Sequence, residues 1–192
     1  MTHMDRTAAY ELMCQYTQNE SLRRHMLTVE VAMQAYANQT DNDPEKWGIV
    51  GLLHDFDYEK HPTQAEHPFI GVEWLRERGD VDDEILDSIL GHATYSGVPR
   101  ESMMSKYLFA VDELAGFIVA VCKVRPAGID GLTPKSVRKK LKTANFAAAV
   151  SRADIALGCE ELSIEPAEHI QFCIDALAAQ GASLGLVSGP AS

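Results

Sequence analysis

Apolar residues recur at helical spacing through almost the whole chain, and this feature limits the fold more than any other. No stretch shows a convincing period-two alternation of apolar and polar residues. Side-chain caps, or a cap followed by proline, mark helix starts at Ser21, Asp43-Pro44, Thr133-Pro134, Ser151 and Glu165-Pro166. These signals predict an all-α, single-domain helical bundle with helices over residues 5–18, 21–39, 44–54, 67–78, 81–93, 101–124, 134–142, 145–149, 151–161 and 166–180.

The length of 192 residues fits one folded domain better than two. Two irregular loops, 55–66 and 94–100, interrupt the helical pattern. The expected organisation is an N-terminal helix, a core, a set of C-terminal helices that completes the bundle, and a flexible tail. These parts cover residues 1–20, 21–125, 126–183 and 184–192, respectively.

The charge of the chain is acidic overall but unevenly distributed. There are 17 Lys and Arg residues against 28 Asp and Glu residues, a formal net charge of −11. Residues 123–142 carry seven basic side chains and one Asp, so this stretch is net +6. An acidic protein repels polyanions, so we expect no nucleic-acid polymer as a partner. The longest apolar run, 116–122, is far shorter than the roughly 20 residues that span a bilayer, and we expect a cytoplasmic protein without membrane contact.

Several titratable side chains fall at positions where a bundle helix should be apolar. One histidine at such a position is commonly a hydrogen-bonded core residue. A buried carboxylate needs a partner, because an unpaired charge away from water is costly. Several such groups on different helices can share a metal ion, and imidazole with carboxylate suits Fe, Mn, Co, Ni or Zn, with Mg as a further candidate. The residues with this pattern are His25, His54, Asp55, His67, His92 and Asp112.

The order of these residues resembles the HD superfamily of metal-dependent phosphohydrolases, which is named for its His-Asp doublet. The signature H…HD…D is matched by His25, His54-Asp55 and Asp112, and the resemblance implies that these residues hold one ion. His67 and His92 match the binuclear members, in which two further histidines and the bridging aspartate bind a second ion. The resemblance covers roughly residues 20–125.

Two positions depart from better-understood relatives. Tyr58 stands three residues after Asp55, where several relatives have lysine, so the role of that lysine does not transfer. The loop 95–99 lacks the Gly-Tyr-Pro motif of cyclic-dinucleotide phosphodiesterases. The longer pattern is similar to stand-alone HD proteins without an assigned substrate.

The resemblance implies a phosphohydrolase, either a phosphomonoesterase or a phosphodiesterase, that acts through a metal-activated hydroxide. The expected substrate is a small phosphorylated metabolite or a nucleotide. We expect catalytic roles for Asp55, Asp57 and Lys60. Nearby cations suggest substrate binding by Arg100, Arg125, Lys139 and Lys140.

Other interpretations stay open at this point. Some HD-type proteins with a similar ligand set are di-iron oxygenases, and a metal ion can also stabilise a non-catalytic ligand-binding module. The basic cluster at 139–142 is more simply explained as a solvated helix face. Apolar residues on the last helices leave room for a homo-oligomer.

Overall fold

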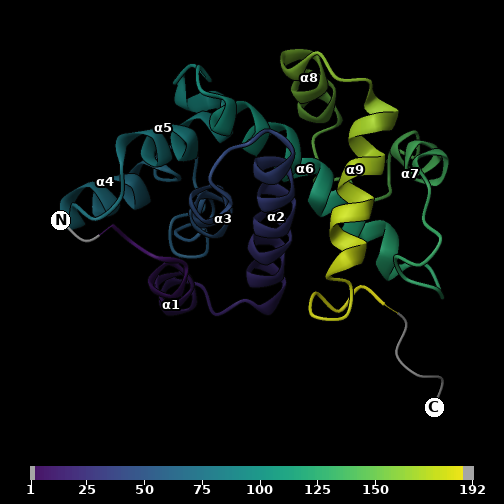
Figure 1. Cartoon of the computed structure of the whole chain (residues 1–192), viewed down its shortest axis with the longest axis horizontal. Coiled ribbons are helices and arrows are strands. Elements are labelled where there is room, and N and C mark those ends of the chain that lie inside the picture. The colour runs from purple at the N-terminus through teal and green to yellow at the C-terminus, as the bar shows by residue number, and fades with distance from the viewer. Residues whose placement is uncertain (1–2, 188–192) are drawn as a thin grey trace. The chain divides into compact units, whose positions relative to one another are not determined.

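The computed structural model describes residues 3–187, and every regular element in that range is helical. No strand occurs among these residues, so the predicted all-α fold class is confirmed. Nor is any helix of residues 3–187 long and apolar enough to cross a bilayer. The helices, labelled in Figure 1, are α1 Arg6–Tyr16, α2 Glu20–Gln39, α3 Pro44–Leu53, α4 Phe69–Arg78, α5 Asp83–His92, the 3₁₀ helix η1 Thr94–Ser96, α6 Met103–Lys123, α7 Pro134–Leu141, α8 Arg152–Leu162 and α9 Pro166–Ala179.

The chain divides into two compact units, and the division falls inside α6, between Phe109 and Ala110. In the first unit α3 occupies the centre and contacts α1, α2 and α5, while α4 lies against α5 (Figure 1). Every residue of α3 from Trp47 to Leu53 is buried. A helix that is apolar on all sides belongs in a core, which explains this central position.

In the second unit α9 contacts both α7 and α8. His169 of α9 is buried, and its Nε2–H donates to the carbonyl oxygen of Ala110 at 2.9 Å. A Cβ at Gly158 of α8 would lie only 2.6 Å from Cα of Ala110, so glycine allows this close approach to α6. His169 is therefore a hydrogen-bonded core histidine.

Nine of the ten predicted helices are present within residues 3–187, and their ends agree with the prediction to within two residues. The prediction of a helix at 145–149 is wrong, because this stretch forms turns. The guanidinium of Arg152 donates to carbonyl oxygens of Phe146, Ala147 and Val150, which leaves those carbonyls outside a helical ladder.

Two further details differ from expectation. The cap of α2 is Asn19 rather than Ser21, since the Asn19 side chain accepts from the backbone N–H groups of Ser21 and Leu22. In the expected tail, Leu184 and Leu186 are buried, and the carbonyl oxygen of Leu186 accepts from the backbone of Ile129 at 2.8 Å. The chain is therefore packed as far as Leu186, and the rest of that tail beyond residue 187 lies outside the described residues.

Candidate metal centre

The first group of ligand-type side chains forms where α2 contacts α3. A Cβ at Gly51 of α3 would lie 2.7 Å from the backbone nitrogen of Glu30 in α2, so glycine lets the two helices approach closely. His25 of α2 and His54, the C-cap residue of α3, meet here with their Nε2 atoms 3.2 Å apart. Oδ2 of Asp55 lies 3.6 Å from Nε2 of His54 and 3.8 Å from Nε2 of His25. Three potential ligands thus converge on one point.

The second group shares Asp55 with the first. Oδ1 of Asp55 lies 3.3 Å from Nε2 of His67 and 3.4 Å from Nε2 of His92. The two Nε2 atoms are themselves 3.2 Å apart. His67 lies in the turn before α4, and His92 is the last residue of α5. Each carboxylate oxygen of Asp55 therefore faces a different pair of histidines.

Hydrogen bonds at Nδ1 orient three of the four imidazoles. His54 and His92 each point Nδ1 at the carbonyl oxygen three residues earlier in the same helix. His67 points Nδ1 at a carboxylate oxygen of Asp57, 2.7 Å away. Carbonyl and carboxylate oxygens only accept, so in the neutral imidazoles Nδ1 carries the hydrogen and Nε2 presents a lone pair.

This arrangement fits divalent metal ions. Two Nε2 lone pairs that face each other at 3.2 Å, as on neutral His67 and His92, repel unless a metal ion or a proton lies between them. Ligand atoms about 2.0–2.2 Å from a common ion lie roughly 3 Å from one another, close to the spacing seen in both groups. Imidazole nitrogens with one shared carboxylate are a donor set for transition metals rather than for Ca²⁺.

The titration of the cluster reflects its density of opposing charges. Burial acts to raise the pKa of Asp55, but the charge of His54 and hydrogen bonds from His67 and His92 outweigh it and hold that pKa well below the usual range. Burial acts to lower the pKa of His67, yet its hydrogen bonds to Asp55 and Asp57 raise it to about 9. At neutral pH an incoming ion therefore has to displace a proton from His67.

Access to the cluster is one-sided. The side chains of His25 and Asp55 are 21% and 17% exposed, whereas the other three imidazoles are at most 6% exposed. Two exposed tyrosines lie near the cluster, Tyr58 against His67 and Tyr95 three residues after His92 in the chain. The ring of Tyr58 stands edge-on to His67 with centroids 5.1 Å apart, and burial together with the charge of Asp55 raises the pKa of Tyr95. Sequence reasoning did not assign either tyrosine to the site.

Three other predicted site residues lie in the first unit. Asp57 is buried, with 1% of its surface exposed. Lys60 is exposed, and its Nζ lies 4.0 Å from the ring centroid of Tyr16. Arg100 is half-buried and donates to the carbonyl oxygen of Gly91 at 2.8 Å, next to His92 in the chain. Their predicted roles in catalysis or substrate binding stay predictions.

The remaining predicted site residues belong to the second unit. Asp112 is half-buried on α6. Arg125 donates to two carbonyl oxygens of the turn that follows α6. Lys139 is exposed on α7, and Nζ of Lys140 lies 4.7 Å from the ring centroid of Phe146. The expectation that Asp112 completes the first metal site stays a prediction, as do the substrate-binding roles of the three cations.

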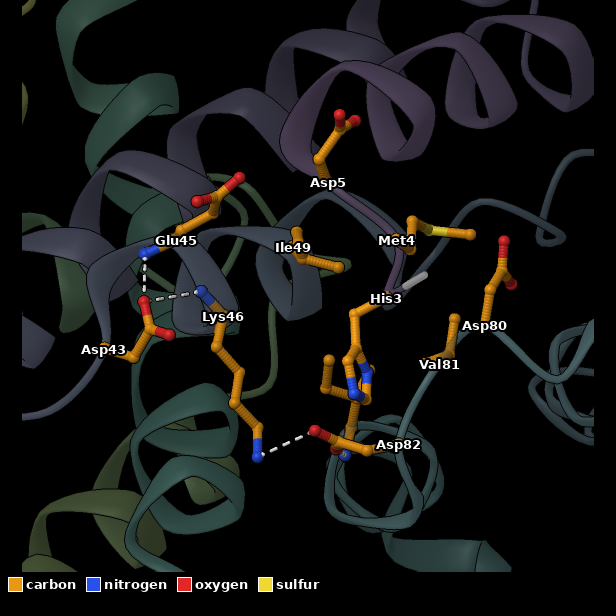
Figure 2. Close-up of a pocket in the computed structure, with 11 residues that line it drawn as sticks. His3, Met4, Asp5, Asp43, Glu45, Lys46, Ile49, Asp80, Val81 and Asp82 are labelled. Carbon is orange, nitrogen blue, oxygen red and sulfur yellow. Dashed lines mark hydrogen bonds and ion pairs between the residues drawn. The ribbon is translucent and has the colours of Figure 1, made fainter. Parts of the chain in front are cut away.

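A separate hollow of about 410 Å³ in the first unit is acidic (Figure 2). Its one lysine, Lys46, is paired through Nζ with Asp82 at 2.9 Å and with Glu84 at 2.6 Å. Such a surface repels a phosphate ester, so the hollow does not compete with the metal cluster as a phosphate site. Its carboxylates are Asp5, Asp43, Glu45, Asp80 and Asp82.

Comparison with known proteins agrees with this geometry. The family model described as HD domain matches residues 22–115. Separate comparisons with curated proteins and with solved structures found no match. The matched range contains the five residues that the structure brings together and Asp112 as well. Residues 22–115 therefore form an HD domain.

Proposed function

We propose that this protein is a metal-dependent phosphohydrolase whose substrate is a small phosphorylated metabolite or a nucleotide. The observation that carries the proposal is the convergence of four imidazole Nε2 atoms on the two oxygens of one carboxylate, Asp55. HD domains are typical of metal-dependent phosphohydrolases. A pair of divalent ions held in this way supplies a water of lowered pKa and neutralises charge that develops on phosphoryl oxygens.

The protein's own residues have defined tasks in this scheme. Asp55 holds the two groups of histidines at a fixed separation, since each of its oxygens faces one group. His54, His67 and His92 are buried, so these three ligand-type side chains lie away from bulk solvent. His25 and the exposed edge of Asp55 leave one direction of approach, which favours reaction at the end of a small molecule over reaction within a polymer.

The rim supports a substrate with an aromatic group. Tyr58 and Tyr95 are 43% and 41% exposed, large values for tyrosine rings beside a buried cluster. Stacking of a nucleobase on such a ring contributes roughly 1–3 kcal/mol of binding free energy, whichever base it is. The Tyr95 hydroxyl is protonated at neutral pH, as any tyrosine with a pKa of 10 or above is, and can donate to an anionic oxygen. Among phosphorylated compounds these features favour nucleotides.

Metal analysis followed by a substrate screen tests the proposal. The purified protein, loaded in turn with Fe, Mn, Co, Ni or Mg, is assayed for phosphate release from a panel of nucleotides and phosphorylated metabolites without oxygen. We expect Asp55→Ala to lower turnover by more than about 100-fold, since it removes a ligand shared by both groups. Asp87→Ala, at an exposed position of α5, is the matched control and should retain activity.

Two results would refute this function. Undiminished hydrolysis by Asp55→Ala would show that the reaction does not use the cluster. Dioxygen consumption by the iron-loaded protein, without phosphate release from any member of the panel, would replace the hydrolase by an oxygenase.

A further inference from the structure

Asp57 is the most completely buried carboxylate beside the cluster, and both of its oxygens are occupied within the protein. Its side chain is 1% exposed. Oδ1 lies 2.7 Å from Nδ1 of His67, and Oδ2 accepts a hydrogen bond from the backbone N–H of Gly71 at 2.9 Å. A buried carboxylate is tolerated when its oxygens are paired in this way. Asp57 is thus directed at a ligand-type histidine and away from solvent.

The bond to Gly71 fastens the loop after α3 to the beginning of α4. The N-cap residue of α4, Pro68, provides no side-chain cap. The first N–H groups of a helix have no partner in the helix itself, and a negative charge close to them is favourable. Asp57 supplies both the acceptor and the charge from a position 14 residues away.

The approach of Asp57 to α4 requires glycine at position 71. A Cβ there would lie 2.7 Å from Cγ and 2.8 Å from Oδ2 of Asp57. Distances below 3.0 Å are essentially never adopted by real Cβ atoms, so something would have to shift. The contact between Asp57 and α4 therefore depends on both residues, Asp57 and Gly71.

The position of His67 explains why its Nδ1 needs a side-chain partner. His54 and His92 lie at the ends of helices, where each finds a backbone carbonyl for Nδ1 three residues earlier. His67 precedes a helix, and its Nδ1 faces a side chain from the preceding loop instead. A carboxylate in this position fixes the tautomer and makes the imidazole a stronger ligand than a carbonyl does.

We propose that Asp57 is a positioning residue that holds His67 with the hydrogen on Nδ1 and the Nε2 lone pair towards Asp55 and His92, and so sets the affinity of the second metal site. This inference rests on the proposed function only in that the cluster binds metal. It changes the role expected for Asp57 from the sequence, because a carboxylate with both oxygens engaged inside the protein does not touch substrate.

Asp57→Asn separates the positioning role from the structural role. The amide oxygen can still accept from the N–H of Gly71. The amide NH₂ then faces Nδ1 of His67 and donates to it, so that Nδ1 becomes the acceptor and the hydrogen moves to Nε2. The opposite orientation would place two donors, NH₂ and the N–H of Gly71, against each other. The variant therefore retains the helix contact and blocks the ligand atom.

The experiment is a Co²⁺ titration of the metal-free full-length protein, followed by visible absorption and calorimetry, with thermal unfolding in chelator as a measure of folding. We expect two ions for the wild type. For Asp57→Asn we expect one ion bound as before, a second ion weakened by about 10- to 100-fold, and an altered absorption band for that ion. Its metal-free unfolding temperature should stay near that of the wild type.

Gly71→Ala tests the same contact between Asp57 and α4 without changing the charge or the hydrogen-bonding groups of Asp57. Its Cβ should displace Asp57 from His67, so this variant should weaken the same ion. Asp87→Asn removes the same charge from an exposed position of α5 and should bind both ions like the wild type.

Each outcome decides the matter. Two ions bound by Asp57→Asn with wild-type affinities and spectra would overturn the positioning role and leave the proposed function intact. Equal weakening of both ions would also overturn it, since the effect would then be structural. A wild-type protein that binds two ions but hydrolyses no phosphoester would overturn the proposed function alone. A wild type that binds no second ion would overturn both.

Discussion

The contact between α2 and α3 predicts a specific response to the substitution Gly51→Ala. The added Cβ would lie 2.7 Å from the backbone nitrogen and Cα of Glu30, whereas ordinary contact begins at 3.4 Å, so the helices must separate by about 0.7 Å. Backbone atoms cannot rotate away, so the cost falls at the upper end of the range of about 1–3 kcal/mol for overpacking. Alanine recovers about 1 kcal/mol of helix propensity, which leaves a loss of about 2 kcal/mol.

For a protein of this length, a loss of that size lowers the unfolding temperature by roughly 4–8 °C. The same separation moves His25 away from His54, whose Nε2 atoms are 3.2 Å apart. A metal site tolerates displacements of about 0.5 Å, so the ion bound by these histidines should be weakened as well. Differential scanning calorimetry and the Co²⁺ titration measure the two effects.

Gly48→Ala is the matched control, one turn earlier in α3. The three nearest contacts of its Cβ would all be with the flexible side chain of Gln34, from Nε2 at 2.6 Å to Cδ at 3.2 Å, and that side chain can move aside. This variant should bind metal normally and unfold at the wild-type temperature or slightly above it. If Gly51→Ala behaved like Gly48→Ala in both measurements, the reasoning from the helix contact would be refuted.

Three further predictions concern single side chains. Burial lowers the pKa of His169 below its usual 6.5, so the unfolded chain binds more protons and the protein becomes less stable as the pH drops from about 6.5. His169→Gln cannot titrate, so its unfolding temperature should fall less between about pH 7 and pH 5; an equal fall would contradict this. Burial raises the pKa of Cys122 from 9.0 to about 11, so its alkylation by iodoacetamide near pH 8 should be about 100-fold slower in the folded than in the denatured protein. Peptide mass spectrometry measures the two rates, and equal rates would show an accessible thiolate. Tyr58→Ala should raise KM for a nucleotide by roughly 5- to 150-fold, whereas Tyr58→Phe should change that KM little. The KM of Tyr58→Ala for a non-aromatic phosphate ester should also change little, and an equal change for both substrates would exclude stacking.

The helices and the ligand residues could be predicted because their signals are local. Caps such as Asp43 before Pro44 act within one turn, and the structure confirms that the side chain of Asp43 accepts from the N–H groups of Glu45 and Lys46. His54 and His92 fall at the ends of apolar faces, so their inward direction followed from helical spacing. The structure brings both together with Asp55, as the order of the residues predicts.

The role of Asp57 could not be predicted in the same way. Its partners are 10 and 14 residues away, across a loop without periodicity. From the sequence its carboxylate is one of several on that loop, and only the approach of Gly71 shows that it is buried. The prediction of a helix at 145–149 failed for a different reason, since the nearby guanidinium of Arg152 holds the carbonyl oxygens of Phe146 and Ala147.

The unequal exposure of the two halves of the cluster has a consequence for metal exchange. An ion held by His67 and His92, whose side chains are 4% and 6% exposed, would lie away from solvent, and we expect it to leave mainly through local opening of the fold. An ion held by His25 lies next to solvent and should exchange with the medium much faster. The ion recovered from the buried pair of histidines would then be the one that was present when the chain folded. The ion recovered from the exposed pair would be the one that was in the last buffer.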